Sequence, residues 1–316
     1  MFKKIIKAIE KYNRIIIHRH SNPDGDALGS QIGLMQVLKD NYPNKEVYIV
    51  GDDTKRYSFM LSSKMDNLSD EQFKSSLCII LDCGAKSLVC DNRFELAGYT
   101  IRIDHHEYVE TFTDLELVDT SYESACGIVT DLVKSSNLNV SKIAATALFT
   151  GMVTDSGRFR YDATTPRTLS LASFLLSCNI DTNEIYRNLY SEDLEMLKIR
   201  SSFIQKITKY EHSNVAYIYN TKEDVEKLKL DTFTISRGMV NVMGDINGID
   251  IWVNFTESEG KVLCELRSSI YNINPIAVKY GGGGHKKASG ATLNSKEEAM
   301  LMLKDLKQLT EEEYEG

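Results

Sequence analysis

Residues 14–40 read RIIIHRHSNPDGDALGSQIGLMQVLKD, and this stretch decides the fold. It begins with three consecutive isoleucines, which is typical of a strand that is buried on both faces. It ends in a segment, residues 29–40, whose apolar side chains recur at helical spacing. The polar run between the two contains His18, His20, Asp24 and Asp26. The stretch therefore predicts a strand, a loop and a helix, and the polar loop requires either a surface turn or a bound partner.

The same pattern recurs along the first 190 residues. Short apolar runs that are typical of strands occur at residues 46–50, 77–82, 100–104 and 115–119. Segments with helical periodicity occur at residues 123–136, 141–155, 167–177 and 183–190. Strands that alternate with helices favour an open, mainly parallel sheet. We therefore expect an α/β domain over residues 1–190.

The remaining residues predict a second, smaller domain. Residues 191–212 form a charged amphipathic segment, which we interpret as a linker helix, although its apolar stripe also suits a core position. Beyond it lie strand-like runs at residues 214–220, 248–258 and 260–269, and helical runs at residues 234–243 and 295–309. This order of elements is typical of an α+β domain, which we place at residues 213–316.

Composition limits the function classes that suit this 316-residue chain. No apolar run approaches the roughly 20 residues of a membrane span. The N-terminus lacks the uninterrupted apolar core of a signal peptide, so we expect a cytoplasmic protein. The net charge of −8 argues against a phosphate-tracking surface for duplex nucleic acid, because such binding neutralises many phosphates. A small anionic substrate held by metal ions remains compatible with this charge.

Acidic residues and histidines follow three of the predicted strands. The first strand leads into His20, Asp24 and Asp26, another ends at Asp82, and a third ends in the run Asp104–His106. The carboxyl ends of parallel strands meet at one edge of a sheet, where ligands bind. Such a cluster of acids would repel itself unless cations or protons neutralised it. We therefore predict a metal site at this edge.

Each of these motifs also has a simpler interpretation. The run NPDGD is typical of a turn, Asp82 could begin a helix, and the two histidines of DHH could be ordinary polar residues. Their coincidence at one sheet edge favours the metal site. Aspartate and histidine without cysteine suit Mn²⁺ or Mg²⁺, and the excess of ligands over one coordination sphere indicates two ions that share Asp82. Two ions about 3.5–4 Å apart are a recurrent apparatus of phosphoryl hydrolysis.

Three further motifs are candidates for the same chemistry. Asp155 ends a predicted helix in TDSGRFRY, where it could also simply terminate that helix. The glycine loop Gly281–Gly284 precedes His285, and successive backbone N–H groups of such a loop can face a phosphate. A flexible turn is the alternative, and the loop lacks the ending of a P-loop. Arg267, on a predicted strand, is a candidate for bidentate phosphate contact or a surface arginine.

The chain resembles the DHH phosphoesterase superfamily, and within it the nanoRNase/pAp phosphatase group. The motifs HSNPDGDALGS, LDC, DHH and TDSGRF occur in the order found in that family, and LRS and GGGGHKKASGA resemble its C-terminal DHH-associated domain. The resemblance implies two Mn²⁺ ions whose ligands are His20, Asp24, Asp26, Asp82, His105 and Asp155. It implies that Asp104 orients His105 and that His106 lies near the scissile phosphate. The residues that it implies for binding the terminal nucleotide of the substrate are Arg267, Gly282, Gly283, Gly284 and His285.

The activity that the resemblance implies is hydrolysis of short single-stranded RNA to mononucleotides and of adenosine 3′,5′-bisphosphate (pAp) to AMP. A phosphodiesterase for cyclic di-AMP or linear pApA would use the same metals and is the first alternative. A non-catalytic nucleotide or RNA binder is the second, because the C-terminal module also occurs without this chemistry. An inorganic pyrophosphatase lacks the glycine-rich domain, and a long-strand DNA exonuclease carries further domains, so both fit less well.

One residue departs from the resemblance. Glu265 precedes the LRS motif, where related sequences often carry a small hydroxyl residue, so the resemblance gives no expectation for the phosphate contact at this position. The sequence leaves the oligomeric state open, a homodimer included, and predicts no membrane partner.

Overall fold

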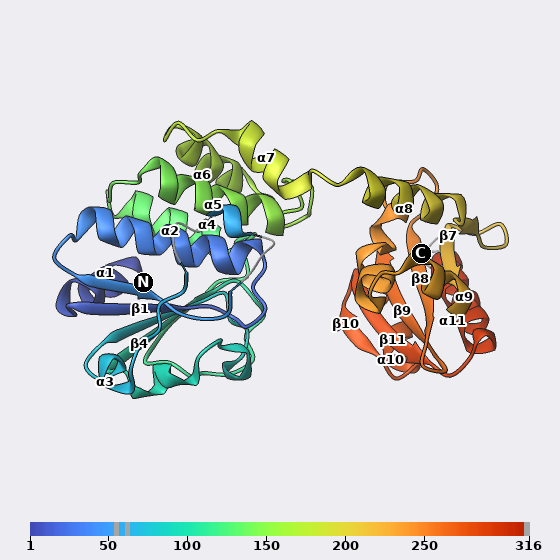
Figure 1. The fold of residues 1–316 in the computed structure, drawn as a ribbon, viewed down its shortest axis with the longest axis horizontal. Coiled ribbons are helices and arrows are strands. Elements are labelled where there is room, and N and C mark those ends of the chain that lie inside the picture. The colour runs from blue at the N-terminus through green and yellow to red at the C-terminus, as the bar shows by residue number, and fades with distance from the viewer. Residues whose placement is uncertain (54–56, 61–63, 313–316) are drawn as a thin grey trace. The chain divides into compact units, whose positions relative to one another are not determined.

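The structure is a computed structural model that describes residues 1–53, 57–60 and 64–312 (Figure 1). The chain forms two compact units, Met1–Ser191 and Glu192–Gly316. Each unit has its own sheet and its own hydrophobic clusters. The predicted combination of an α/β domain with a smaller α+β domain is confirmed.

The first unit is built on a five-stranded parallel sheet. Its strands run in the spatial order β2 (Glu46–Ile49), β1 (Arg14–His18), β3 (Leu77–Leu81), β4 (Tyr99–Asp104) and β5 (Leu115–Val118). These strands coincide with the five apolar runs of the sequence. β3 is buried at every position, which explains its continuous apolar sequence. Because β1, β3 and β4 are neighbours, their carboxyl ends lie together at one edge of the sheet.

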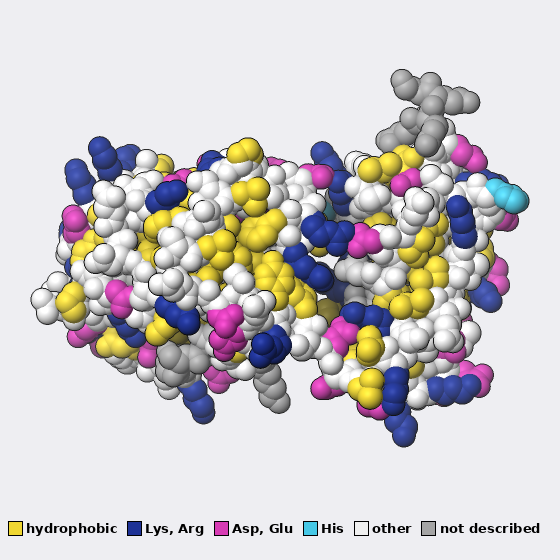
Figure 2. All heavy atoms as spheres, turned by 90° about the horizontal axis from the view of Figure 1, so that it is seen from above, with side chains coloured by type: hydrophobic (Ala, Val, Ile, Leu, Met, Phe, Trp, Pro, Cys, Tyr) yellow, Lys and Arg dark blue, Asp and Glu magenta, His cyan; other side chains and the backbone are white. Residues whose placement is uncertain are grey.

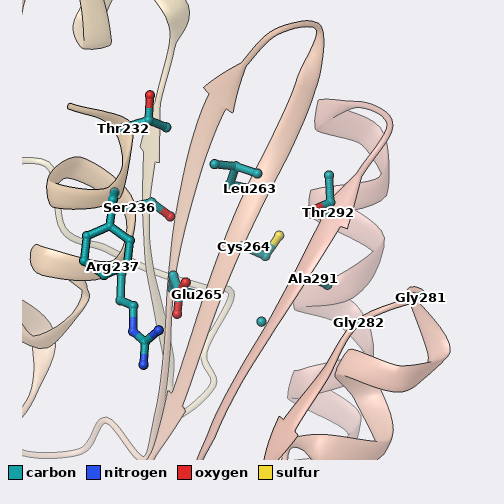
Figure 3. Close-up of a pocket in the computed structure, with 12 residues that line it drawn as sticks. Thr232, Ser236, Arg237, Leu263, Cys264, Glu265, Gly281, Gly282, Ala291 and Thr292 are labelled. Atoms are coloured by element: carbon teal, nitrogen blue, oxygen red, sulfur yellow. The ribbon is translucent and has the colours of Figure 1, made fainter. Parts of the chain in front are cut away.

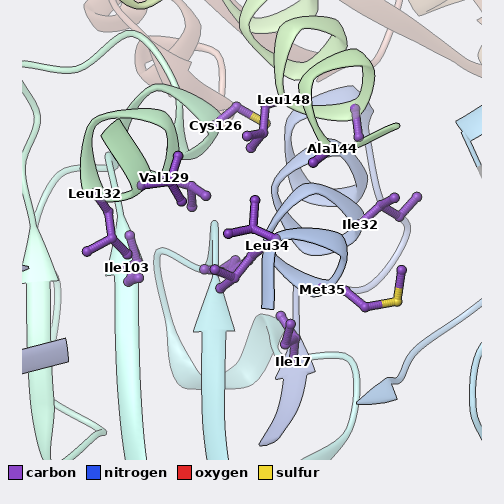
Figure 4. Close-up of a cluster of buried hydrophobic side chains, with 14 of the residues drawn as sticks. Ile17, Ile32, Leu34, Met35, Ile103, Cys126, Val129, Leu132, Ala144 and Leu148 are labelled. Atoms are coloured by element: carbon purple, nitrogen blue, oxygen red, sulfur yellow. The ribbon is translucent and has the colours of Figure 1, made fainter. Parts of the chain in front are cut away.

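Helices and short turns cover both faces of this sheet. Its long helices are α1 (Phe2–Lys11), α2 (Gly25–Asn41), α4 (Ala125–Ser135), α5 (Lys142–Asp155), α6 (Pro166–Leu176) and α7 (Thr182–Tyr190). The short elements are α3 (Asp70–Phe73), η1 (Ser58–Met60), η2 (Lys86–Leu88) and η3 (Asn92–Leu96). Ile17 points into the main core with side chains of α2, α4 and α5 (Figure 4), whereas Ile16 joins a second core with Phe73 and Phe94. The strand is therefore buried on both faces, as its sequence predicts.

Three glycines set how closely α2 approaches α5. A Cβ atom on Gly25 would lie 2.4 Å from Oγ1 of Thr154, and one on Gly29 would lie 2.6 Å from the carbonyl oxygen of Ala147. One on Gly33 would lie 2.5 Å from Cγ of Leu148. These glycines recur at every fourth residue and therefore form one face of the helix, which we call the glycine column (Gly25, Gly29 and Gly33). The column lets α2 lie against α5 with little space between them.

The second unit is built on a six-stranded mixed sheet. Its strands run in the order β10 (Gly283–His285), β11 (Ala288–Leu293), β9 (Lys261–Ser268), β8 (Ile251–Ser258), β7 (Val215–Asn220) and β6 (Thr208–Lys209). The pair β7 and β8 is parallel, and the other pairs are antiparallel. Its helical elements are α8 (Leu194–Gln205), α9 (Lys222–Leu228), η4 (Thr234–Gly238), η5 (Val240–Met243), α10 (Asn274–Lys279) and α11 (Lys296–Glu312).

Two segments of the second unit differ in detail from the sequence analysis. The helical run at residues 234–243 is not one α-helix, because it consists of the π-helical turn η4 followed by the 3₁₀ turn η5. The segment interpreted as a linker contains α8, and Phe203 of α8 is buried in a cluster with Ile218 and Met239. The structure thus groups α8 with the second unit, and the division into residues 1–190, 191–212 and 213–316 stays a prediction.

The surface carries charges of both signs. On the face shown in Figure 2, Lys and Arg side chains lie interspersed with Asp and Glu side chains. Among the helices that the structure describes, none combines the length and the apolar character that a membrane span requires.

Candidate metal centre

Residues from several segments of the first unit meet at the carboxyl edge of its sheet. His20 follows β1, Asp24 precedes the first residue of α2, and Asp26 lies in its first turn. Asp82 directly follows β3, Asp104 is the last residue of β4, and Asp155 is the last residue of α5. This edge therefore brings together the side chains of His20, Asp24, Asp26, Asp82, His105 and Asp155.

Asp82 lies between three imidazole rings. Its Oδ2 is 3.5 Å from Nε2 of His20, and its Oδ1 is 3.4 Å from Nε2 of His105 and 3.5 Å from Nδ1 of His106. The backbone of Asp82 has a φ of 55°, in the left-handed region that few residues other than glycine adopt. Its side chain is 2% exposed, so a carboxylate is held away from water at the centre of the cluster.

Two more groups of ligand atoms surround this carboxylate. In one, atoms of His20, Asp24 and Asp82 lie within 4.8 Å of one another. In the other, the same limit holds for atoms of Asp26, His105 and Asp155. Nε2 of His105 is 3.7 Å from Oδ2 of Asp26 and 3.5 Å from Oδ2 of Asp155. Atoms of Asp82, His105 and His106 meet the same limit, so Asp82 and His105 link the two groups.

The two aspartates of the PDGD turn are held in different ways. Oδ1 of Asp24 accepts hydrogen bonds from the N–H groups of Asp26 and Ala27, so this residue caps α2. The carboxylate of Asp26 accepts hydrogen bonds from the N–H groups of Ala125 and Cys126 at 2.7 and 2.8 Å. These two N–H groups begin α4, whose partial positive charge stabilises the ionised carboxylate. The predicted turn is thus also a helix start, and α4 fixes the position of Asp26.

Asp104 contacts His106 rather than the ring of His105. Its Oδ1 lies 2.8 Å from Nδ1 of His106 and also accepts a hydrogen bond from the backbone N–H of His105. Its Oδ2 accepts a 2.6 Å hydrogen bond from Nη2 of Arg102, and both side chains are fully buried. The expectation that Asp104 orients His105 is therefore corrected, because the imidazole that this carboxylate orients is that of His106.

Sequence analysis missed Arg102. Its guanidinium donates hydrogen bonds to the carbonyl oxygens of Gly84 and Glu110 and lies over the ring of Phe112. A charged residue in the middle of the apolar run at residues 100–104 was the signal that could have found it. Burial raises the pKa of Asp104, but His106 and Arg102 outweigh this effect and lower it, so Asp104 stays ionised.

The protein alone compensates the negative charge of the cluster only in part. Burial lowers the pKa of His20, but Asp24 and Asp82 raise it more, to about 10. The pKa of His105 is raised to about 10 in the same way by Asp82, Asp26 and Asp155, against the effect of burial. Burial also raises the pKa of Asp155 to about 7, and burial together with Asp82 and Asp155 raises that of Asp26. Without cations, the cluster therefore retains protons that a divalent ion would displace.

The donor set fits a divalent metal ion. Oδ1 of Asp82 is buried and has no hydrogen-bond partner among the described residues, although a buried carboxylate oxygen normally has one. The backbone carbonyl of Ser21 lies 2.8 Å from Nδ1 of His20, which leaves Nε2 as the coordinating atom. A set of carboxylate oxygens and imidazole nitrogens without cysteine suits hard or borderline ions.

His18 is separated from this centre. Its ring is fully buried, with centroid distances of 5.9 Å to Phe73 and 6.1 Å to Phe94. Of the two histidines in the opening loop, only His20 thus faces the ligand atoms, and His18 packs in the core as a structural residue.

The predicted substrate-binding residues lie in the second unit. Arg267 is on β9, where its Nη1 donates to the carbonyl oxygen of Leu266 at 2.7 Å and lies 3.2 Å from Oε2 of Glu265. Gly283, Gly284 and His285 form the edge strand β10. The N–H of Gly282 donates to the carbonyl oxygen of Ala277, so it is already engaged within the unit. His285 is exposed, and the role of these residues in binding the substrate stays a prediction.

A pocket of about 430 Å³ lies beside this loop (Figure 3). Its walls come from the segment around η4, from β9 and β11, and from the start of the glycine loop. Phe233 and Arg237 line it, and sequence analysis singled out neither, because a pattern search has no reason to connect η4 with the glycine loop.

Comparisons with known proteins identify both units. Residues 14–152 match the N-terminal domain of the DHH family, and residues 202–312 match the DHHA1 domain. The chain is 33% identical, over 99% of each chain, to the bifunctional oligoribonuclease and PAP phosphatase NrnA of Bacillus subtilis. It is 27% identical to the cyclic-di-AMP phosphodiesterase GdpP of Geobacillus thermodenitrificans, over 90% of this chain and 45% of that one.

A solved structure supports the same relationship. An exopolyphosphatase-related protein from Bacteroides fragilis superposes with a TM-score of 0.83 and 27% identity, over 96% of this chain and 94% of that one. The chain therefore belongs to the DHH family and is a metal-dependent phosphoesterase whose DHH domain is joined to a DHHA1 domain.

Proposed function

We propose that this protein hydrolyses short oligoribonucleotides to mononucleotides and removes the 3′-phosphate of pAp to give AMP. The observation that carries the proposal is the placement of Asp82, whose buried carboxylate contacts both groups of ligand atoms and has an oxygen without a hydrogen-bond partner among the described residues. The near full-length similarity to the bifunctional oligoribonuclease and PAP phosphatase of Bacillus subtilis supports this choice of substrates.

The proposed cofactors are two Mn²⁺ ions. One would be held by His20, Asp24 and Asp82, and the other by the same Asp82 with Asp26, His105 and Asp155. In support, ligand atoms of His20, Asp24 and Asp82 lie within 4.8 Å of one another, as do those of Asp26, His105 and Asp155, and Oδ1 of Asp82 lies 3.4 Å from Nε2 of His105. When bound, such ions lower the pKa of water and stabilise the attacking and leaving oxygens of a phosphoryl transfer.

The proposed catalytic residues next to the ions are His106 and Asp104. His106 is 44% exposed, so its ring is accessible to a substrate. Asp104 accepts the hydrogen bond of Nδ1 and raises the pKa of His106, which favours a proton on Nε2. A protonated Nε2 can donate to an oxygen of the phosphate or of the leaving group. Asp104 acts as a positioning residue in this scheme.

The proposed binding residues for the terminal nucleotide are Arg267, Gly283, Gly284 and His285. Nη1 of Arg267 contacts Leu266 and Glu265, and Nη2 would bind the anion. Gly282 would contribute through its missing side chain rather than its N–H group. The mixed charges of the surface in Figure 2 favour a small substrate over a duplex.

The test is a side-by-side measurement of turnover. Short RNA, pAp, pApA and cyclic di-AMP are each incubated with the purified protein in Mn²⁺, in Mg²⁺ and after chelation. We expect kcat/KM to be highest for short RNA and pAp with Mn²⁺, and activity to disappear on chelation. Faster cleavage of cyclic di-AMP or pApA would favour the first alternative, to which the similarity with GdpP points. Binding of all four without cleavage would favour a non-catalytic nucleotide binder.

A further inference from the structure

Three glycines, Gly281, Gly282 and Gly290, contribute backbone to the wall of the pocket in the second unit. Gly290 of β11 pairs with Glu265 of β9, and the strand therefore presents no side chain at the position opposite this glutamate. Gly282 lies directly on this strand, since a Cβ atom there would come within 2.0 Å of the carbonyl oxygen of Gly290. The absence of side chains at these glycines contributes to the volume of the pocket, which is about 430 Å³.

Three side chains of different chemistry line this space. Phe233 is 66% exposed, so its ring is accessible to a ligand in the pocket. The guanidinium carbon of Arg237 lies 5.7 Å from the centroid of the Phe233 ring. In Figure 3, the guanidinium of Arg237 and the carboxylate of Glu265 point toward the same end of the pocket. The pocket therefore combines an aromatic surface with a hydrogen-bond donor and an acceptor.

The segment that carries Arg237 is a π-helical turn. η4 spans Thr234–Gly238, and such turns are rare and frequent at functional sites. The turn places Ser236 and Arg237 on the pocket, while Ile235 packs in the core beneath. The π-helical turn thus places two polar side chains at the wall of the pocket.

Glu265 connects this pocket to the proposed phosphate site. Residues 263, 265 and 267 lie on the same face of β9, because every second side chain of a strand points the same way. Glu265 and Arg267 are thus about 7 Å apart along the strand, a spacing comparable to that between the base and the 5′-phosphate of one nucleotide. Oε2 of Glu265 holds Arg267, which leaves Oε1 for a ligand in the pocket.

We infer that this pocket binds the nucleobase of the terminal nucleotide and prefers guanine, with Glu265 and Arg237 as the residues that determine the specificity. The inference rests on the proposed function only in taking a nucleotide as the ligand. Oε2 of Glu265 is paired with Arg267, and a carboxylate repels a phosphate, so a ligand group that approaches Oε1 from the pocket has to be a hydrogen-bond donor. Glu265, which departs from the pattern of related sequences, would thus serve to select the base.

Guanine is the base whose edges match both residues. Its N1–H and N2–H₂ groups are both donors and lie on the edge that would face Oε1 of Glu265. Its O6 and N7 atoms accept, and arginine is their usual bidentate partner. Adenine presents the opposite pattern, because its N1 would face the carboxylate and its N6–H₂ group would face the guanidinium. An exposed aromatic ring such as that of Phe233 can stack on either base, so stacking adds affinity without selection.

The test is calorimetric binding of GMP and AMP to the full chain in the presence of a chelator. We expect GMP to bind roughly 10-fold more tightly than AMP, as one good bidentate contact provides. E265Q should reduce this ratio to near one, because an amide replaces one acceptor with a donor. R237M should weaken GMP binding and leave AMP binding unchanged. E259Q, in an exposed turn of the same unit, is the matched control and should keep the wild-type ratio.

Each outcome decides the inference. Equal binding of GMP and AMP by the wild-type protein would overturn it, and so would failure of both to bind. A GMP preference that survives in E265Q and R237M would remove both residues from the role of selecting the base. Kinetic constants for pGpN and pApN dinucleotides then separate the two proposals. A chain that selects GMP but hydrolyses neither dinucleotide keeps the base pocket and loses the proposed function.

Discussion

The backbone of Asp82 enters the left-handed region directly after β3, and its carboxylate lies between three imidazole rings. Aspartate and asparagine tolerate this conformation better than other side chains with a Cβ atom. Residue 82 therefore needs both a side chain that tolerates the left-handed conformation and a negative charge. Asparagine tolerates the conformation but lacks the charge, so Asp82→Asn tests the charge alone.

Asp82→Asn is expected to abolish metal-dependent hydrolysis while the fold survives. The loss in kcat/KM should exceed about 100-fold, since even residues that only support a metal ligand cost 10–100-fold. Calorimetric Mn²⁺ titration and urea unfolding measure metal affinity and folding separately. Asp40→Asn, an exposed carboxylate on α2, serves as the control. Unchanged Mn²⁺ affinity and turnover in Asp82→Asn would exclude a bridging role.

His18 shows how differently two neighbouring histidines behave. Both of its ring nitrogens are buried without a hydrogen-bond partner among the described residues. Burial lowers the pKa of His18 from its ordinary value of 6.5 to about 4, and the nearby Asp91 and Arg93 act in opposite directions. The folded protein thus holds a neutral imidazole, whereas the unfolded chain takes up a proton below pH 6.5.

The free energy of unfolding should therefore fall on acidification through His18. Its contribution is fully present above pH 6.5 and is lost as the pH falls toward about 4. Between about pH 7 and about pH 5 the loss should amount to about 2 kcal/mol. Urea unfolding of the wild type and of His18→Leu, both in chelator, measures this difference. If the two proteins lose the same stability over this interval, His18 does not titrate as described.

At the scale of elements, the glycine column of α2 determines how the two ligand-bearing helices meet. Asp26 lies at the start of α2 and Asp155 at the end of α5, so the spacing of these helices fixes the spacing of two proposed ligands. Gly151 of α5 belongs to the same contact, because a Cβ atom there would lie 3.1 Å from Cα of Asp26. The spacing of α2 and α5 thus determines both the packing of the core and the distance between these two proposed ligands.

Gly29→Ala should destabilise the protein more than Gly33→Ala. The new methyl at residue 29 would meet a backbone carbonyl, which cannot move without shifting α5, whereas the one at residue 33 would meet the side chain of Leu148. Alanine gains about 1 kcal/mol over glycine in a helix, which offsets part of each cost. Urea unfolding gives the two free energies, and Mn²⁺ titration should show weaker binding for Gly29→Ala. Equal effects of the two variants would contradict a rigid contact at residue 29.

The sequence predicts the strands of the first unit well because each is a short apolar run that ends at polar residues. β1, β3 and β4 end where their apolar runs end, and the proposed ligands follow at once. Parallel pairing then places these ends together, so the composition of the metal site is foreseeable. The register of individual contacts is not foreseeable. The hydrogen bonds from α4 to Asp26 cross about 100 residues of sequence, and no local pattern announces them.

Two other features could not be predicted from the sequence, because they also depend on contacts between distant residues. Arg102 is recognisable as a charged residue in a buried strand, but its contact with Asp104, rather than with a surface acid, depends on the turn that follows. The pocket of the second unit needs the proximity of η4 to the glycine loop, which are more than 40 residues apart. Helical periodicity also cannot distinguish a π-helical turn from an α-helix.

At the scale of the whole molecule, metal binding should stabilise one unit and not the other. All proposed ligands lie in the first unit, whereas Trp252, the one tryptophan of the chain, lies on β8 of the second. Saturating Mn²⁺ at about 100 times its Kd adds about 2.7 kcal/mol to the folded state that binds it. Circular dichroism reports on both units, and tryptophan emission reports on the second.

Mn²⁺ should therefore raise one of two unfolding midpoints seen by circular dichroism and leave the midpoint of Trp252 emission unchanged. Chelator should restore the original midpoint. Asp82→Asn provides the control, because its unfolding should not respond to Mn²⁺. A midpoint of tryptophan emission that rises together with the dichroism signal would show that the two units unfold as one.

The distribution of the proposed ligands along the chain has a consequence for biosynthesis. The residues of the first group, His20, Asp24 and Asp82, all precede β4, whereas the second group is complete only with Asp155 at the end of α5. A growing chain that has been made only as far as β4 therefore lacks Asp155, and the pairing of the distant strands that would bring its other ligands together is slow. The second ion would thus enter only a domain that has been made through α5, so it stabilises a finished structure instead of directing its assembly.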